Sequence, residues 1–256
     1  MKGNGMTPNE ISHWSFSSLK MLSNCPRSWY VQYVKKEKQP SGSAAAFGSA
    51  FDQGVCKRLG ISVEKEPEQI ILSEEDENNL NEAVGFYALQ PQAQFWHGGE
   101  GQVKIEITPE EWTEYADMYG TESRLNVPII GYIDMLQSNG PTVEICDLKM
   151  SGRAEFRSEW PLQLLLYSLA KRASVCHIHL LTRLKKGFGF HAYRFRPTKQ
   201  SYAWMINTLG WLADQGERAR MAESEEQLPS NSGWWCSYCP RNIDCEANRL
   251  QSVEVY

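Results

Sequence analysis

The chain has 256 residues, 41% of them hydrophobic, and a formal net charge of −5. It is long enough for one large domain with a sizeable core, and its composition excludes a disordered protein. The acidic balance argues against a globally basic nucleic-acid binder. No apolar run approaches the ~20 residues of a membrane span, and the polar segment 1–10 lacks the apolar stretch of a secretory signal. We therefore expect a cytoplasmic protein without membrane contact.

The first third of the sequence has helical patterns. Apolar residues recur at helical spacing over 15–36, and Pro26 predicts a break or kink near Cys25. The alanine-rich stretch 43–59 and the stretch 73–89, which begins with a serine and acidic residues, predict two more helices.

The pattern then changes to that of strands. Strands are predicted over five stretches: 103–107, 127–136, 142–149, 175–184 and 188–195. Helices are predicted over 156–172 and 198–221, whereas 108–126 is ambiguous and allows a helical insertion. The order helices, three strands, helix, two strands, helix predicts an α/β fold with a mixed central sheet flanked by helices.

Two aspartates and a lysine lie on the predicted hairpin of 127–149. Residues two apart in a strand face the same side, so Asp147 and Lys149 project together, and Asp134 lies on the neighbouring strand. Two carboxylates this close repel each other unless a cation lies between them, and Mg²⁺ or Mn²⁺ suits oxygen ligands. Asp-x-Lys is common by chance, but here it ends an apolar strand, where charges are costly. The arrangement predicts hydrolysis of phosphodiester bonds.

The apolar helix that follows carries two polar residues on one face. Gln163 and Tyr167 are four positions apart, and the edge of the site could give them partners. Taken alone, the pair is better explained as the rim of an ordinary core. Glu106 is a further acidic candidate but is better explained as an exposed strand residue. His177 and His179 alternate on one strand face and are better explained as half-exposed than as metal ligands.

Seven cysteines in a chain without an export signal favour metal binding over a disulfide framework. Cys236 and Cys239 are spaced Cys-x-x-Cys, Cys245 follows after five residues, and Cys25 lies far upstream. Four thiolates suit either Zn²⁺ or an iron–sulfur cluster, and the ligand type does not separate the two. Core packing is expected for the other three cysteines: Cys56, Cys146 and Cys176.

With these motifs in this order, the sequence resembles the PD-(D/E)XK nuclease superfamily and, within it, RecB-like exonucleases. The most similar members are the CRISPR-associated and AddB-type nucleases that carry an iron–sulfur cluster. The likeness spans most of the chain and is carried by six segments: 17–30, 48–52, 131–134, 147–149, 163–167 and 236–245.

The resemblance implies a restriction-endonuclease-like core within a single nuclease domain, 1–256. Its parts would be a helical N-terminal part at 1–100, a catalytic α/β core at 101–200, and a C-terminal helix at 201–256. The last part would end in a cysteine loop that is closed by a metal cluster.

The resemblance also implies roles for individual residues. The implied catalytic residues are Asp134, Asp147, Lys149, Gln163 and Tyr167. The implied metal ligands are Asp52, Asp134, Asp147 and the backbone carbonyl of Leu148. The family usually has histidine at the position of Asp52, and a carboxylate there shifts the preference toward harder ions. The family often has threonine where this chain has Met150, which puts a minor phosphate or backbone contact in doubt. For the four thiols, the resemblance favours a 4Fe–4S cluster over Zn²⁺.

The expected function is that of a divalent-metal-dependent DNA exonuclease in recombination, repair or end processing. Its expected partners are DNA, single-stranded or with free ends, and a helicase or recombination protein. One competing hypothesis is a DNA-binding or helicase-partner module, clamped by Zn or Fe–S, in which Asp52 has disabled catalysis. Another is a zinc-clamped interaction protein. Retention of Asp134, Asp147, Lys149 and Gln163 favours the enzyme, because an inactive site has no physical need for buried charges.

Overall fold

The computed structural model describes residues 11–37, 42–63, 69–241 and 244–245. The chain divides into two compact units. The sheet unit comprises residues 41–106 and 131–205, and the terminal unit comprises residues 1–40, 107–130 and 206–256. Among the described helices, none has the length and apolar composition of a membrane span. Residues 1–10, on which the prediction of no secretory signal depends, lie outside the described residues.

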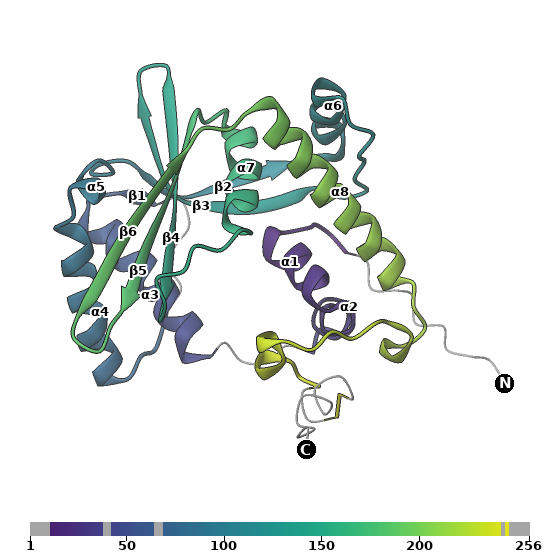
Figure 1. Ribbon diagram of the computed structural model, residues 1–256, viewed down its shortest axis with the longest axis horizontal. Coiled ribbons are helices and arrows are strands. Elements are labelled where there is room, and N and C mark those ends of the chain that lie inside the picture. Colours follow the sequence, from purple (N-terminus) through teal and green to yellow (C-terminus); the bar gives the residue numbers. More distant parts are fainter. Residues whose placement is uncertain (1–10, 38–41, 64–68, 242–243, 246–256) are drawn as a thin grey trace. The chain divides into compact units, whose positions relative to one another are not determined.

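A mixed sheet of six strands, in the order β1-β2-β3-β4-β5-β6, forms the framework of the sheet unit (Figure 1). The strands are β1 Ser62–Val63, β2 Glu100–Ile107, β3 Ile129–Asn139, β4 Thr142–Ser151, β5 Val175–Arg183 and β6 Phe188–Phe195. β1 pairs with β2, and β4 with β5, in parallel, whereas β3–β4 and β5–β6 are antiparallel. The five predicted strands and the mixed sheet are therefore confirmed. The two-residue β1 is too short to give a periodic signal.

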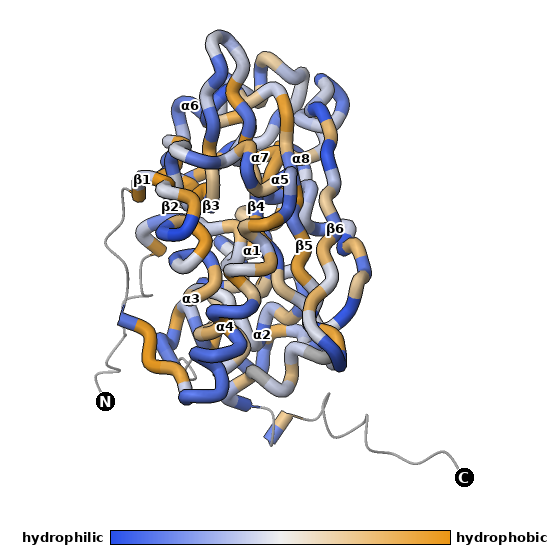
Figure 2. Tube along the Cα trace, turned by 90° about the vertical axis from the view of Figure 1, so that its left-hand side faces the viewer, coloured by the Kyte–Doolittle hydropathy of each residue, from blue (hydrophilic) through white to orange (hydrophobic). Residues whose placement is uncertain are grey.

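Helices cover both faces of this sheet (Figure 1). α3 Ser43–Arg58, α4 Glu74–Ala88 and α5 Pro91–Gln94 lie on one face, and α7 Trp160–Lys171 lies on the other. Figure 2 shows that the residues of α4 are largely hydrophilic, whereas those of the buried strand β5 are largely hydrophobic. Cys56 of α3 and Cys146 of β4 lie in one buried core cluster, and Cys176 is buried in β5, so the core positions predicted for these three are confirmed.

Helix α7 begins later than its sequence pattern predicts. The apolar pattern starts at Phe156, but the first helical residue is Trp160 and Pro161 occupies the first turn. A proline lacks the N–H of a helix interior but fits the first turn, so Pro161 places the start of the helix just before itself. Phe156 remains outside the helix, with its ring 5.8 Å from that of Trp160.

The terminal unit is built mainly from helices. They are α1 Phe16–Asn24, α2 Pro26–Trp29, the π-helix η1 Tyr30–Val34, α6 Pro109–Tyr119, and the 3₁₀ turns η2 Glu225–Gln227 and η3 Trp234–Tyr238. The long helix α8, Lys199–Arg220, begins in the sheet unit and continues into this one. Cys25 has extended backbone between α1 and α2, which confirms the predicted break before Pro26.

The ambiguous stretch 108–126 contains the helix α6. Thr108 accepts a hydrogen bond from Glu111 N, and the Glu111 side chain accepts one in return from Thr108 N, at 3.2 and 2.9 Å. This reciprocal pair satisfies two backbone donors at the start of the helix, and Gly120 ends it in the left-handed region.

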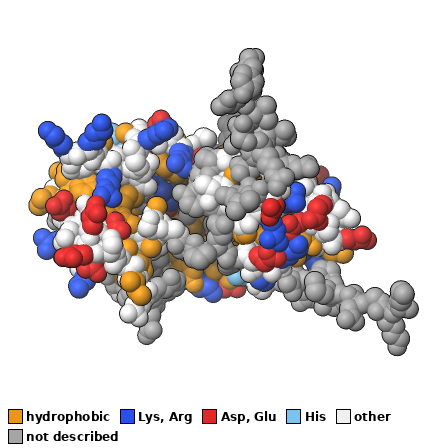
Figure 3. Space-filling view, turned by 90° about the horizontal axis from the view of Figure 1, so that it is seen from below, with side chains coloured by type: hydrophobic (Ala, Val, Ile, Leu, Met, Phe, Trp, Pro, Cys, Tyr) orange, Lys and Arg blue, Asp and Glu red, His pale blue; other side chains and the backbone are white. Residues whose placement is uncertain are grey.

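Charged side chains of both signs lie beside one another on the face drawn in Figure 3. Lys104 and Glu106 are exposed on β2 and form an ion pair of 2.7 Å. The expectation that Glu106 is an exposed strand residue is therefore confirmed. Such mixed surfaces agree with the small net charge of −5.

The two histidines of β5 lie on one face, as predicted, but His179 is buried instead of half-exposed. His179 is 2% exposed, and its Nδ1 lies 2.7 Å from the hydroxyl of Tyr87. His177 Nε2 lies 2.6 Å from a carboxylate oxygen of Glu144. Burial, and to a smaller degree the charge of His177, lowers the pKa of His179 to about 3.

Replacement of His179 by glutamine should reduce the sensitivity of the protein to acid. Because its folded-state pKa is lowered, neutral His179 contributes stability above pH 6.5 that is lost as the pH falls toward 3. At pH 5 the lost contribution is about 2 kcal/mol. Urea unfolding at pH 6.5 and 5 measures this term as the difference between the parent and His179→Gln. The exposed His191→Gln is the matched control, and equal acid sensitivity of all three proteins would contradict the prediction.

Candidate active site

The β3–β4 hairpin brings two of the predicted acidic residues together. The strands are joined by Gly140 and Pro141, and Gly140 has the positive φ of 60° that a tight turn needs. The paired register runs from Asn139–Thr142 to Met135–Cys146. Just beyond the last paired residues, the carboxylate of Asp134 on β3 accepts a hydrogen bond from Leu148 N on β4 at 2.8 Å. The side chain of Asp134 therefore takes the place of a backbone acceptor where the two strands separate.

This separation of the strands also affects the carbonyl of Leu148. The N–H and C=O of one residue in a strand point to the same side. Since Leu148 N–H points to Asp134, its carbonyl faces the same gap between β3 and β4. Asp134 and the Leu148 carbonyl, two of the predicted metal ligands, therefore lie on one side of β4.

Asp147 and Lys149 lie on β4 and form an ion pair. Lys149 Nζ is 2.8 Å from Oδ1 and 2.7 Å from Oδ2 of Asp147, which is 2% exposed. Burial alone would lower the pKa of Lys149, but the charges of Asp147 and Asp134 outweigh it and raise that pKa. The amine therefore stays protonated beside the two carboxylates.

The polar pair on α7 extends this network. Lys149 Nζ lies 3.4 Å from Oε1 of Gln163, and the amide of Gln163 donates to the hydroxyl of Tyr167 at 3.0 Å. The rim explanation is therefore incomplete, because both side chains connect to Lys149. Burial raises the pKa of Tyr167 to about 12, so the phenol stays neutral.

Gly131 of the Gly-x-x-Asp segment makes room for Tyr167. A Cβ atom at Gly131 would lie 2.7 Å from Cε1 and 2.9 Å from the hydroxyl of Tyr167. A larger residue at position 131 of β3 would push the ring of Tyr167 away from β3. The glycine therefore permits the approach of the α7 side chains to the hairpin.

Asp52 lies on α3 and interacts electrostatically with the charged residues of the hairpin. Burial raises its pKa well above the usual range, and the charges of Asp134 and Asp147 add to this, whereas Lys149 opposes it. Burial likewise raises the pKa of Asp134 to about 7, with a further increase from Asp147, against the opposing effect of Lys149. One lysine thus faces three carboxylates whose full ionisation is unfavourable in the metal-free protein.

The chemistry of this donor set fits a hard divalent cation. Mg²⁺ prefers carboxylate and carbonyl oxygens, keeps several waters, and needs only one or two carboxylates. Asp134, Asp147 and the Leu148 carbonyl meet that requirement. Within the described ranges, however, no three side chains of histidine, cysteine, aspartate or glutamate are grouped as a metal site. Joint ligation of a metal ion by Asp134, Asp147, the Leu148 carbonyl and Asp52 therefore stays a prediction.

Gln102 is a site residue that the sequence pattern did not indicate. Its side chain amide donates to Oδ1 of Asp134 at 3.4 Å, so that Leu148 and Gln102 contact the two oxygens of one carboxylate. Gln102 has a φ of 51° within β2, in the left-handed region that favours glycine. The only local signal was the preceding glycine, Gly101, because the bond depends on a partner 32 residues away.

Substitution of Gln102 by glycine should separate stability from activity. Glycine relieves a backbone conformation that costs about 1–2 kcal/mol, so the melting temperature should be unchanged or higher. Loss of a hydrogen bond to a charged group should still reduce cleavage at least about tenfold. Gln102→Asn, which tolerates the left-handed backbone less well than glycine and has a shorter side chain, should lose activity with a smaller gain in stability. Full activity of Gln102→Gly would show that the amide does not orient Asp134.

The four predicted cluster cysteines lie in the terminal unit, and each is buried with 6–8% of its surface exposed. Two contacts bring their neighbours together: Asn231 Nδ2 donates to the Asn24 carbonyl at 3.1 Å, and Arg27 N donates to the Pro229 carbonyl at 3.3 Å. Within the described residues the four cysteines form no group of metal-ligating side chains, so the cluster stays a prediction.

Glu225 makes a second connection between the chain ends that sequence patterns did not indicate. It is 3% exposed, and its carboxylate lies 2.5 Å from Lys35 Nζ and 2.8 Å from Arg241 Nε. Arg241 also lies 2.7 Å from Glu37. Burial alone would raise the pKa of Glu225, but hydrogen bonds from Arg241 and Lys35 outweigh it and lower that pKa. We call Glu225, Lys35 and Arg241 the Glu225 node.

Comparison with known proteins identifies the family of the chain. The family model described as PD-(D/E)XK nuclease superfamily matches residues 13–246. No curated protein matches the chain. The crystal structure of a "Putative exonuclease" from Eubacterium rectale is similar in fold, with a TM-score of 0.56 and 11% identity over 96% of this chain and 90% of that chain.

A second solved structure, named SSO0001, covers 94% of this chain and 88% of its own, with 13% identity. Its TM-score of 0.46 is too low to support an argument about fold. The narrower resemblance to RecB-like and AddB-type nucleases stays a prediction. The superfamily match spans the β3–β4 hairpin, α7 and all four predicted cluster cysteines, and the mixed sheet agrees with it. The chain therefore belongs to the PD-(D/E)XK nuclease superfamily, whose members are metal-dependent hydrolases of phosphodiester bonds.

Proposed function

We propose that the protein is a divalent-metal-dependent DNA exonuclease that acts in recombination, repair or end processing. The observation that carries the proposal is the arrangement on β3 and β4. Asp134 is fixed by Leu148 N–H, and beside it Asp147 holds Lys149 at 2.7–2.8 Å. A DNA-binding module without catalysis would gain nothing from holding these charges together.

A bound Mg²⁺ or Mn²⁺ would supply a water of lowered pKa and positive charge next to the phosphate. In this proposal Asp134, Asp147 and the carbonyl of Leu148 hold the ion, and Asp52 adds a further carboxylate. Lys149 keeps its proton and stabilises negative charge that develops on the phosphate oxygens. Gln163 orients Lys149, and Tyr167 in turn orients Gln163.

The direct test is incubation of the purified protein with end-labelled linear DNA, single- and double-stranded, carrying the label at either the 5′ or the 3′ end. We expect stepwise shortening from an end with Mg²⁺ or Mn²⁺ and none with a chelator. Cleavage that begins inside the chain would replace the exonuclease by an endonuclease. No hydrolysis with either ion would favour the alternative, a DNA-binding or helicase-partner module.

We also propose that the four terminal-unit thiols bind a 4Fe–4S cluster, with Zn²⁺ as the alternative. Support comes from their burial, from the Cys-x-x-Cys spacing and from the two hydrogen bonds that join the neighbours of Cys25 to residues 229 and 231. Anaerobic purification, visible absorption and iron analysis test this. A colourless, zinc-containing protein of full activity would overturn the cluster.

Single-stranded or free-ended DNA is the proposed substrate, and a helicase or recombination protein is the proposed partner.

A further inference from the structure

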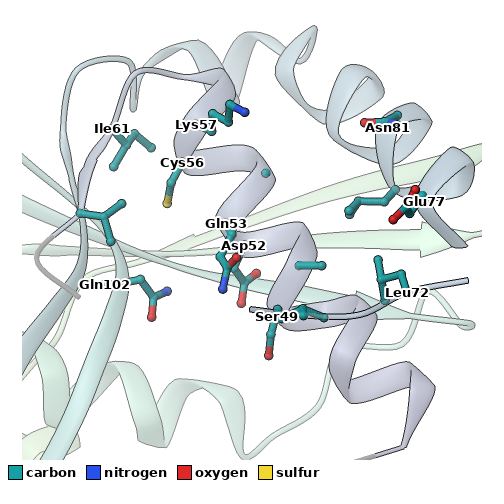
Figure 4. Close-up of a pocket in the computed structure, with 15 residues that line it drawn as sticks. Ser49, Asp52, Gln53, Cys56, Lys57, Ile61, Leu72, Glu77, Asn81 and Gln102 are labelled. Atoms are coloured by element: carbon teal, nitrogen blue, oxygen red, sulfur yellow. The ribbon is translucent and has the colours of Figure 1, made fainter. Parts of the chain in front are cut away.

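A pocket of about 730 Å³ lies within the sheet unit, between α3, α4 and the β1–β2 edge (Figure 4). This volume falls in the range of small-molecule sites, roughly 300–1,000 Å³. Asp52 and Gln102 belong both to its lining and to the carboxylate network around Asp134. The pocket therefore opens directly beside the site where we propose that a phosphodiester is cleaved.

The two sides of the pocket differ in chemistry. On the side of α4, Glu77 and Asn81 project toward it, one helical turn apart (Figure 4). Gln102 lies on the opposite side, on β2. A phosphate would be repelled by the carboxylate of Glu77, so the α4 side suits a ligand group that is uncharged and offers N–H donors.

Apolar side chains complete the lining. Ile61 comes from the segment before β1, Leu72 from the segment before α4, and Leu80 from α4 between Glu77 and Asn81. Leu80 also packs against the buried core under α3, which keeps this wall in place. The lining thus combines apolar surfaces with a carboxylate and an amide on one helix.

We propose that this pocket receives the base of the nucleotide next to the scissile phosphate. A nucleobase has apolar π faces and a polar edge of N–H donors and acceptors, which matches Leu72 and Leu80 beside Glu77 and Asn81. The phosphate of the same nucleotide then points toward Asp52 and the carboxylates of the hairpin. The substrate strand must therefore be unpaired at this nucleotide, because a paired base cannot enter the pocket. This inference rests on the proposed function.

The test compares two leucine substitutions on one helix. Asn81→Leu removes the amide that lines the pocket, and Asn78→Leu is the matched control, since Asn78 is exposed on α4 and does not line it. Substrates are a labelled single-stranded oligonucleotide, the same oligonucleotide with an abasic residue at the 5′ or 3′ terminus, and bis(4-nitrophenyl) phosphate, which has no base. Thermal melting of both variants checks that they fold.

We expect Asn81→Leu to raise the KM for the normal oligonucleotide about tenfold, the effect of one lost polar contact to a base. The KM values for the abasic oligonucleotide and for bis(4-nitrophenyl) phosphate should not change. Asn78→Leu should behave as the parent on all substrates. Equal behaviour of the two variants, or equal KM of the parent for normal and abasic ends, would overturn the base-binding role.

Failure of the proposed function gives a different result, since the parent would then hydrolyse none of the three substrates. In that case, a measurement of oligonucleotide binding tests whether the pocket receives a base. Fluorescence anisotropy of the labelled oligonucleotides, measured with chelator, should show about tenfold weaker binding by Asn81→Leu of the normal strand only. Identical Kd values of parent and Asn81→Leu would reject the base site without reference to catalysis.

Discussion

Alanine at Asp134 or at Lys149 should slow DNA cleavage by roughly 10²–10³-fold or more while the protein remains folded. Each substitution removes a charged group of the site: the carboxylate that Leu148 N–H fixes, or the ammonium beside Asp147. Loss of one preorganised electrostatic group of this kind costs about 3–4 kcal/mol, or roughly 10²–10³ in rate. Single-turnover cleavage of end-labelled DNA with Mn²⁺ measures the effect.

Matched controls for both substitutions exist on β2. Lys104 and Glu106 form an exposed ion pair of the same charge types, so Lys104→Ala and Glu106→Ala should keep the parental rate. Circular dichroism and thermal melting establish that all four variants fold. Undiminished cleavage by purified Asp134→Ala or Lys149→Ala would refute the assignment of the active site to the β3–β4 hairpin.

Substitution of Asp52 by asparagine should stabilise the metal-free protein and weaken its catalysis. Burial opposes ionisation of Asp52, and the charges of Asp134 and Asp147 add to this, so negative charges on these carboxylates destabilise the metal-free protein more as the pH rises. Asparagine removes one of these charges and keeps the shape, so the melting temperature should rise by about 2–4 °C for each kcal/mol of repulsion removed. Cleavage should fall by about tenfold or more, because a carboxylate that faces the cation is lost.

The pH dependence of this stabilisation has a definite sign. The pKa of Asp134 is raised to about 7, so protonated Asp134 contributes stability that is fully present at low pH and is lost as the pH rises through 7. The gain from Asp52→Asn should therefore be larger at pH 8 than at pH 6. Mn²⁺ should raise the melting temperature of the parent at pH 8 by more than that of the variant. A variant that melts lower than the parent in chelator at pH 8 would contradict this account.

The hairpin could be predicted because its signals are local. Alternating apolar residues, a Gly-Pro turn and charges at the end of an apolar strand all lie within 127–149, and the structure has these strands. The break at Cys25 was equally local, since Pro26 alone enforces it. Patterns of this kind depend on the backbone of a few consecutive residues and leave a period in the sequence.

What sequence patterns did not indicate depends on distant partners. Gln102 is placed at Asp134 by a backbone conformation that its residue type does not favour. The buried His179 has its hydrogen-bond partner in Tyr87, 92 residues earlier. Glu225 attracts Lys35 from the other end of the chain. In each case the environment of the side chain depends on one polar contact with a residue distant in the sequence. Such a contact leaves no periodic pattern in the sequence.

The Glu225 node has a consequence for the metal cluster that we propose for the terminal unit. Because a carboxylate that is 3% exposed holds Lys35 at 2.5 Å and Arg241 at 2.8 Å, the first and last parts of the terminal unit are tied by charge as well as by any metal. A molecule from which the proposed cluster has been removed should keep these two parts aligned and accept a new cluster without first refolding. Buried ion pairs are screened by salt less than exposed ones. The alignment of the two parts should therefore persist at ionic strengths that weaken ordinary surface ion pairs.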